Sequence, residues 1–182
     1  LIFGQTFHDL EKLARCLQDE RPGKRDVALY LRDPHVVLSY APQDLFLDPS
    51  HTFRLWLERY QYSHRRPKGF LVRMLNSQAD ADAVHRLYAS RRMVPPSAEF
   101  IWEHRASRVV QCWVAEDEQD GAILGAVNGV DHVEAFGDSE GGASLWALAV
   151  DAQASYPGIG EALVRQVCEF YQARGRAFLD LS

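Results

Sequence analysis

The stretch LWALAVDAQASYPGIGEAL, residues 145–163, decides how the rest of the chain is interpreted. Residues 145–150 are continuously apolar, which is typical of a strand covered on both faces. Residues 151–157 are polar and turn-forming, and Gly158 and Gly160 then open a helix whose apolar positions follow a 3.6-residue period. Residues 177–181 begin another strand. The stretch therefore predicts a strand, a glycine turn, a helix and a second strand parallel to the first.

The glycine turn is predicted to bind phosphate. The first turn of a helix carries free N–H groups and the positive end of the helix dipole, and both attract anions. Gly158 and Gly160 lack a Cβ, so a phosphate can approach the backbone closely. The alternative is a tight turn without a ligand, because short glycine motifs often match by chance. A Gly-Lys-Ser/Thr P-loop and the third glycine of a Rossmann motif are absent from the sequence, so those motifs fit less well.

Composition narrows the functional classes. With 182 residues, 47% of them hydrophobic, the chain suits one domain of ~150 residues plus an appendage. A net charge of −5 without a basic run argues against nucleic-acid binding. No apolar run approaches the ~20 residues of a membrane span, and no signal peptide is visible. Three widely spaced cysteines favour reduced thiols and a cytoplasmic location, and no His or Cys spacing indicates a metal site.

The first part of the chain, residues 1–63, is predicted to be a small α/β extension. Its expected elements are a helix at residues 6–19, strands at 27–31 and 36–38, a short piece at 45–47 and a helix carrying residues 53–60. A polar boundary follows at residues 63–69.

Residues 70–182 are predicted to form the main domain. Its expected elements are a strand at 70–75, helices at 78–91 and 97–106, antiparallel strands at 109–115 and 123–133, and then the unit that begins at residue 145. The order is β-α-α-β-β-β-α-β.

The glycine motif and this order together resemble the GCN5-related N-acetyltransferases (GNAT family). The family's acetyl-CoA motif is Gln/Arg-x-x-Gly-x-Gly/Ala after a Val-Asp-Pro-like strand end. Val150-Asp-Ala and Gly158-x-Gly160 fit it, whereas Ser155 stands where Gln or Arg is usual. The resemblance covers residues 70–182. It implies a mixed α/β fold of the acyl-CoA N-acyltransferase type, truncated after its fifth strand.

The resemblance implies acetyl-CoA as the cofactor, bound in a wedge where two parallel strands splay apart. Backbone groups of the central strand would hydrogen-bond the pantetheine arm, and the helix N-terminus would hold the pyrophosphate. An arginine one turn into the helix would add charge-assisted contacts, with a solvated surface arginine as the alternative. The predicted cofactor-binding residues are Leu148, Ala149, Val150, Gly158, Ile159, Gly160, Glu161 and Arg165.

Acetyl transfer requires a neutral amine. A free α-amine has a pKa of ~8, so a general base helps without needing to be strong. The candidates are Glu134, Asp131 and His132, near the end of the predicted strand at 123–133. Glu134 is predicted to be the base because it would sit near the splay point, and a solvated surface acid is the alternative. No proton donor is assigned, and Tyr156 is placed on the cofactor side.

A narrower resemblance concerns the acceptor. Residues 30–38, 44–51 and 132–137 resemble the amino-terminal part of bacterial N-acetylglutaminylglutamine synthetases. This implies a small amino-acid-derived amine as acceptor, such as glutamine or glutaminylglutamine. It also implies a C-terminal ATP-grasp domain as partner and a place in osmoprotectant biosynthesis. Whether the protein is a homodimer stays open.

Two further functions remain open at this point: a non-catalytic acyl-CoA-binding module that regulates a larger ligase, and a protein or peptide N-acetyltransferase. The final strand at 177–181 would leave an apolar edge unpaired, and such edges are normally covered. Within the chain, the extension is the only candidate to cover it. We expect the 182-residue chain, read as a truncated enzyme, to transfer little acetyl group on its own.

Overall fold

The computed structural model describes residues 8–19, 21, 31, 33–47, 51–63 and 67–181. The chain divides into two compact units, Leu1–His51 and Thr52–Ser182, which are taken separately. Within the described ranges no helix is long and apolar enough to cross a membrane. Of the strand predicted at 27–31, only Leu31 is described.

The first unit contains two helices, α1 (Leu10–Gln18) and α2 (Pro34–Tyr40), which pack around Leu13, Ala14, Val37 and Ala41. The predicted first helix is confirmed over the α1 range, where the Asp9 side chain accepts a hydrogen bond from the N–H of Lys12. The strand predicted at 36–38 is wrong, because Pro34 fixes the first turn of a helix there. Residues 45–47 have no regular structure.

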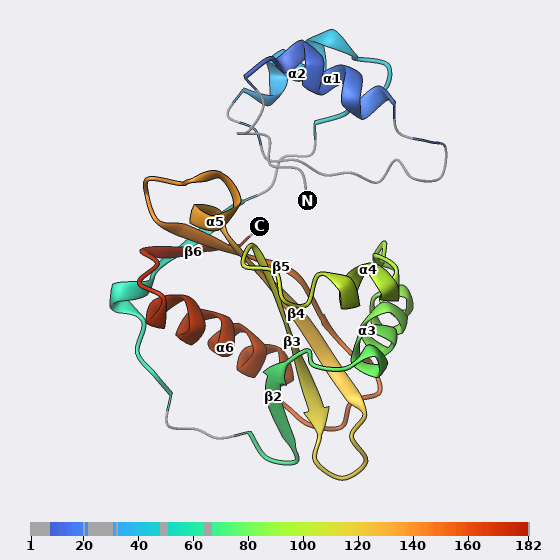
Figure 1. Ribbon diagram of the computed structural model, residues 1–182, viewed down its shortest axis with the longest axis vertical. Helices are drawn as coiled ribbons and strands as arrows, with labels where there is room; N and C mark the ends of the chain where they lie inside the picture. Colours follow the sequence, from blue (N-terminus) through green and yellow to red (C-terminus); the bar gives the residue numbers. More distant parts are fainter. Residues whose placement is uncertain are drawn as a thin grey trace. The chain divides into compact units, whose positions relative to one another are not determined.

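The second unit is built on a six-stranded mixed sheet in the order β1-β6-β5-β4-β3-β2 (Figure 1). Its strands are β1 (Phe53–Trp56), β2 (Phe70–Met74), β3 (Val110–Asp117), β4 (Ile123–Asp131), β5 (Gly142–Val150) and β6 (Phe178–Leu181). β5 and β6 run parallel, and the other neighbours are antiparallel. This arrangement confirms the predicted mixed α/β class and the parallel pair at the end of the chain.

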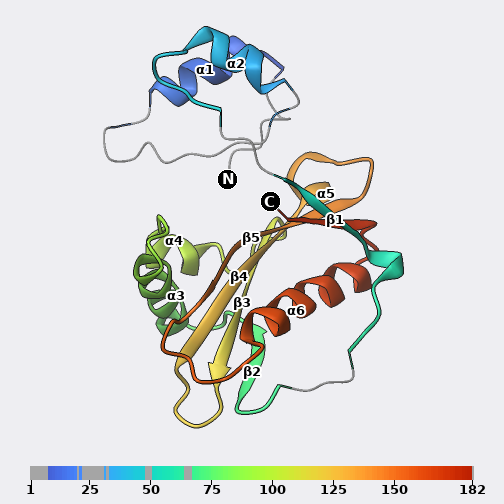
Figure 2. The ribbon, with the colours of Figure 1, turned by 180° about the vertical axis from the view of Figure 1, so that it is seen from behind.

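Helices cover both faces of the sheet (Figures 1 and 2). Helices α3 (Gln78–Ser90) and α4 (Ala98–Glu103) lie on one face, and α6 (Ile159–Ala173) lies on the other. The short helices are η2 (Leu57–Arg59) after β1 and α5 (His132–Phe136) after β4. Each face has its own core, one around Trp113, Leu163 and Tyr171, the other around Val84 and Tyr88.

The helix predicted over residues 53–60 is wrong, because residues 53–56 form strand β1. Phe53 and Trp56 pair with Leu181 and Phe178 of β6, and η2 then buries Leu57 completely. The open edge of β6 offers backbone partners that an isolated amphipathic segment cannot find by itself, so tertiary pairing overrides the local pattern. Residues 53–56 of the predicted extension thus cover the edge of β6. The compact units divide between His51 and Thr52, and the domain boundary predicted at residues 63–69 stays a prediction.

A second correction concerns the end of β4. The strand predicted at 123–133 ends at Asp131, whose carboxylate accepts hydrogen bonds from the N–H groups of Val133 and Glu134 and so caps α5. His132 and Glu134 therefore lie on a helix, where positions two apart point in different directions. They do not share a strand face as predicted.

Two glycines of β4 let α6 lie directly on the sheet. A Cβ on Gly125 would come within 3.0 Å of Ile159 and Leu163 side-chain atoms. A Cβ on Gly129 would lie 2.6 Å from Cε2 of Tyr171 and 2.9 Å from Trp113. The aromatic neighbours are buried and cannot move aside. The absence of these two side chains therefore sets how closely α6 approaches β4.

We predict that Gly129→Ala lowers the free energy of unfolding by about 1–3 kcal/mol, because the new methyl group overpacks the contact with Tyr171. The measurement is chemical denaturation. Gly160→Ala is the matched control, since a Cβ there meets only Val150 at 3.7 Å and alanine favours a helix by about 1 kcal/mol. Equal stability of Gly129→Ala and the natural chain would contradict the close packing of α6 on β4.

Candidate active site

Strands β5 and β6 pair in parallel over three residues. Gly142, Ala143 and Ser144 of β5 face Phe178, Leu179 and Asp180 of β6, and the pairing ends there. From Leu145 onward, β5 keeps β4 as its neighbour, but no described strand lies on its other side. An extended ligand can bind along the edge of a strand as another strand would. The wedge implied by the family resemblance stays a prediction.

The open part of β5 contains a bulge. Ala126 and Asn128 of β4 face Ala149 and Trp146, so one residue of β4 opposes both Ala147 and Leu148. Ala147 has φ of 52°, a left-handed conformation that alanine rarely adopts and that costs of order 1 kcal/mol. The Leu148 side chain is exposed, whereas Ala149 is buried. The three predicted pantetheine-binding residues, Leu148, Ala149 and Val150, thus lie at and just after the bulge, where Ala149 and Val150 pair with Ala126 and Gly125 of β4.

The turn after β5 is held in place by its own contacts. The N–H of Asp151 donates to the carbonyl of Leu124 at 2.8 Å, and its side chain accepts from Gln153 at 2.8 Å. The Tyr156 ring packs against Phe70 and over Gly69, where a Cβ would lie 2.2 Å from Cε1 of Tyr156. Tyr156 therefore anchors the turn to the start of β2, and the sequence offered no signal for this role.

The turn leads directly into α6, whose first N–H groups precede the first intrahelical hydrogen bond. Gly158 adopts φ of 86° as the cap of α6 and provides no side-chain capping bond. The first intrahelical hydrogen bond runs from the N–H of Ala162 to the carbonyl of Gly158, so the N–H groups of Ile159, Gly160 and Glu161 precede it. Nothing in the fold requires glycine at position 160, because a Cβ there would make one ordinary contact. Packing therefore leaves the predicted role of Gly160, close approach of a phosphate, available.

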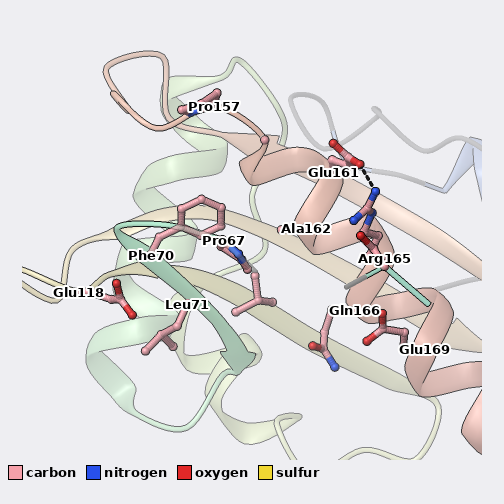
Figure 3. A pocket seen from close by; sticks show the side chains of 13 residues that line it. Pro67, Phe70, Leu71, Glu118, Pro157, Glu161, Ala162, Arg165, Gln166 and Glu169 are labelled. Atoms are coloured by element: carbon pink, nitrogen blue, oxygen red, sulfur yellow. Dashed lines mark ion pairs between the residues drawn. The ribbon is translucent and has the colours of Figure 1, made fainter. Parts of the chain in front are cut away.

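A groove of about 460 Å³ lies between α6 and β2, beside this turn (Figure 3). Gly158, Glu161 and Arg165 line it, so it shares the predicted phosphate-binding residues but not the wedge between β5 and β6. Figure 3 shows Arg165 directed at Glu161, with which it forms an ion pair one turn apart. The predicted phosphate contact of Arg165 therefore competes with a carboxylate of its own helix.

The predicted base, Glu134, faces arginines. Its carboxylate lies 3.7 Å from Nη2 of Arg174 and 4.0 Å from Nη2 of Arg176. Asp131 is fully buried, and Nε of Arg176 donates to both of its carboxylate oxygens at 2.9 and 3.0 Å. Asp131 thus ties β4 to the start of β6 and is a structural residue.

His132 contacts the end of the paired part of β5. Its Nε2 is 2.8 Å from Oγ of Ser144, the last residue of β5 that pairs with β6. Trp146 Nε1 donates to the same oxygen at 2.6 Å. Burial of the imidazole lowers the pKa of His132, against the opposing effect of Asp138, Asp180 and Asp131. Sequence reasoning named His132 but missed Ser144 and Trp146, which are hidden in an apolar run.

Comparison with known proteins decides the family. Residues 40–181 match the acetyltransferase (GNAT) family. The chain belongs to this family. No match was found among curated protein sequences.

Solved structures agree on the fold. An acetyltransferase from Trypanosoma brucei is 20% identical with a TM-score of 0.51, over 62% of this chain and 83% of its own. An aminoglycoside acetyltransferase from an uncultured soil metagenomic sample, in complex with sisomicin, is 22% identical with a TM-score of 0.51, over 63% and 78%. A GCN5-related N-acetyltransferase from Sphaerobacter thermophilus is 18% identical with a TM-score of 0.54, over 71% and 40%.

As a GNAT acetyltransferase domain, the chain uses acetyl-CoA as its cofactor. Its residues fit this group. The unpaired edge of β5 suits the amide-containing pantetheine arm, and the glycine-opened N-terminus of α6 suits the pyrophosphate. When bound, acetyl-CoA supplies an acetyl thioester.

We predict that Gly160→Ala weakens acetyl-CoA binding at least tenfold, or about 1.4 kcal/mol, and that Gly160→Asp abolishes it. The methyl group blocks close approach to the backbone, and the carboxylate adds repulsion. Both variants should stay folded, because the site has room for a Cβ and an acidic residue suits a helix N-terminus. Isothermal titration calorimetry measures the affinity. Unchanged affinity for acetyl-CoA in Gly160→Asp would show that the cofactor does not bind at this turn.

We also predict that Glu161→Gln tightens acetyl-CoA binding by roughly threefold to tenfold. The substitution removes a negative charge beside the pyrophosphate and releases Arg165 from its ion pair. Arg165→Gln should weaken binding, and both effects should shrink with added salt. Glu103→Gln on α4 is the control. Weaker binding in Glu161→Gln would mean that this carboxylate supports the cofactor site.

Proposed function

We propose that the domain is an acetyl-CoA-dependent N-acetyltransferase that acts on a small amino-acid-derived amine. The observation that carries the proposal is the bulged strand β5 leading to the glycine-capped N-terminus of α6, within a match to the acetyltransferase family. Leu148, Ala149 and Val150 would bind the pantetheine arm through their backbone. The N–H groups of Gly158, Ile159, Gly160 and Glu161 would bind the pyrophosphate, with Arg165 as an additional cation.

Arg54 and Asp180, at the end of the paired part of β5 and β6, carry charges that suit a zwitterionic acceptor. Arg54 of β1 donates two hydrogen bonds to Asp180 of β6 at 2.8 and 2.9 Å. Asp180 faces Ser144 across the last pair between β5 and β6. The charges of Arg54 and Asp180 therefore lie beside that end of β5. An amino acid offers the complementary pair, an ammonium for Asp180 and a carboxylate for Arg54. This favours a free amino acid or short peptide over a neutral amine.

The narrower resemblance of residues 30–38, 44–51 and 132–137 supports glutamine or glutaminylglutamine as acceptor. It also supports a C-terminal ATP-grasp ligase domain as the partner of this one. Such a ligase would supply or consume an amide-bonded glutamine derivative. The role of Glu134 as general base stays a proposal, and two arginines lie within 4.0 Å of its carboxylate.

One observation favours a second function, a non-catalytic acyl-CoA-binding module. Arg165 is paired with Glu161, and Ser155 replaces the usual Gln or Arg of the phosphate loop, so the turn presents less positive charge than the motif expects. A module of this kind would bind acetyl-CoA without turnover.

Substrate profiling tests the proposal. At saturating acetyl-CoA, we expect CoA release and an acetylated product with glutamine or glutaminylglutamine, at a kcat/KM at least tenfold above that for a lysine-containing peptide. The physical reason is the paired charge at the splay point, which a blocked peptide terminus does not complement. Gly160→Asp is the inactive control. Faster acetylation of the peptide would favour a peptide acetyltransferase, and tight binding without any product would favour the regulatory module.

A further inference from the structure

The turn between β5 and α6 is held at both of its ends. At the first end, the N–H of Asp151 donates to the carbonyl of Leu124, and its own carbonyl accepts from the N–H of Ala154 at 3.2 Å. At the other end, Ile159 begins α6 and is only 2% exposed. Between these two points, the Tyr156 ring packs against the core under α6. The second half of the turn therefore has a side-chain contact of its own with the sheet.

Gly69 is the seat of the Tyr156 ring. A Cβ at position 69 would lie 2.2 Å from Cε1 of Tyr156 and 2.8 Å from both Cδ1 and Cζ, so the ring lies directly against the glycine backbone. Gly69 also has φ of 84°, a conformation that favours glycine. On its other side the ring lies 6.1 Å from that of Phe70, which is 3% exposed. The fit therefore requires glycine at position 69 and a flat ring at position 156.

This seat belongs to the paired ends of β2 and β3. Phe70 pairs with Asp117, and the carbonyl of Gly69 accepts from the N–H of Glu118 at 3.0 Å. The Tyr156 hydroxyl donates to Oδ1 of Asp117 at 3.5 Å, which is long for a hydrogen bond. The ring, more than the hydroxyl, thus joins the turn to a part of the sheet whose backbone is already paired.

The contact lies close to the groups that are predicted to bind phosphate. Pro157 and Gly158 alone separate Tyr156 from Ile159. The φ of Pro157 is restricted by its own ring, and Gly158 has φ of 86°. Because this segment is so short, the positions of Tyr156 and Ile159 restrict the direction in which the first N–H groups of α6 point.

We propose that Tyr156, seated on Gly69, is a positioning residue for acetyl-CoA: it holds the N–H groups of residues 159–161 in the orientation that binds the pyrophosphate. The inference rests on the proposed function, which puts the pyrophosphate at this turn. Tyr156 acts through the backbone and does not touch the reacting atoms. A turn that is already ordered loses less conformational entropy when its ligand binds, so the contact raises the affinity for acetyl-CoA.

Isothermal titration calorimetry with acetyl-CoA tests the proposal. Tyr156→Ala should raise the Kd about tenfold, whereas Tyr156→Phe, which keeps the ring, should stay within about twofold of the natural chain. Gly69→Ala should also raise the Kd about tenfold, because its Cβ displaces the ring. Gly175→Ala is the matched control, since Gly175 has a similar φ of 72° but a Cβ there would meet no described atom within 4 Å. It adds similar backbone strain and should bind acetyl-CoA like the natural chain.

The double variant of Gly69→Ala with Tyr156→Ala distinguishes one shared contact from two independent defects. Once the ring is absent, the Cβ at position 69 has no ring to displace. The double variant should therefore bind acetyl-CoA no more than about twofold more weakly than Tyr156→Ala. Additive losses, about 100-fold together, would overturn the proposal, and so would natural affinity in Tyr156→Ala.

S-acetylpantetheine, an acetyl donor without the pyrophosphate, gives a readout that a general loss of structure would not move selectively. In Tyr156→Ala, kcat/KM for acetyl-CoA should fall about tenfold, while kcat/KM for S-acetylpantetheine should stay within about twofold of the natural chain. Equal losses with both donors would overturn the proposal. A natural chain that binds acetyl-CoA but acetylates no amine would instead overturn the proposed function, and the calorimetry would still decide the role of Tyr156.

Discussion

The contact between α6 and β4 is the constraint on which the site depends. Gly125 and Gly129 leave space that Leu163 and Tyr171 fill, and the Tyr171 hydroxyl donates to buried Gln111 at 2.7 Å. This contact sets the height and direction of the helix over the sheet. Because α6 begins right after the turn that leaves β5, the same contact places its open N-terminus beside the unpaired stretch of β5. Packing at both ends of the helix thus fixes the position of its N-terminus.

Strand β6 pairs with β5 over three residues and is also held on its other side. Strand β1 holds β6 from the far side, with Arg54 and Asp180 joined across the pair. The bulge at Ala147 increases the local twist of β5 just after its last pair with β6.

Three acidic or basic groups that are adjacent in sequence acquire different roles through their surroundings. Asp131 is buried, accepts hydrogen bonds from Arg176 and caps α5, so its carboxylate has a structural role. Glu134 lies beside two arginines, and burial lowers the pKa of His132 in an aromatic site. Environment and not residue type separates a structural acid, a surface acid and a candidate proton acceptor.

The sequence by itself determined the elements whose signals are local. The apolar run at residues 145–150, the pair Gly158 and Gly160 and the helical period that follows are readable without a structure, and they led to the mixed sheet and the family. Strand β1 and helix α5 were decided by tertiary structure. Phe53–Trp56 forms a strand because β6 offers it an edge, and the chain turns at Asp131 because that carboxylate caps a helix while binding Arg176. The pairing of His132 with Ser144 joins residues from two elements across an interface that periodicity does not record. Local patterns specify which backbone conformations have low free energy, but only packing specifies which side chains come into contact.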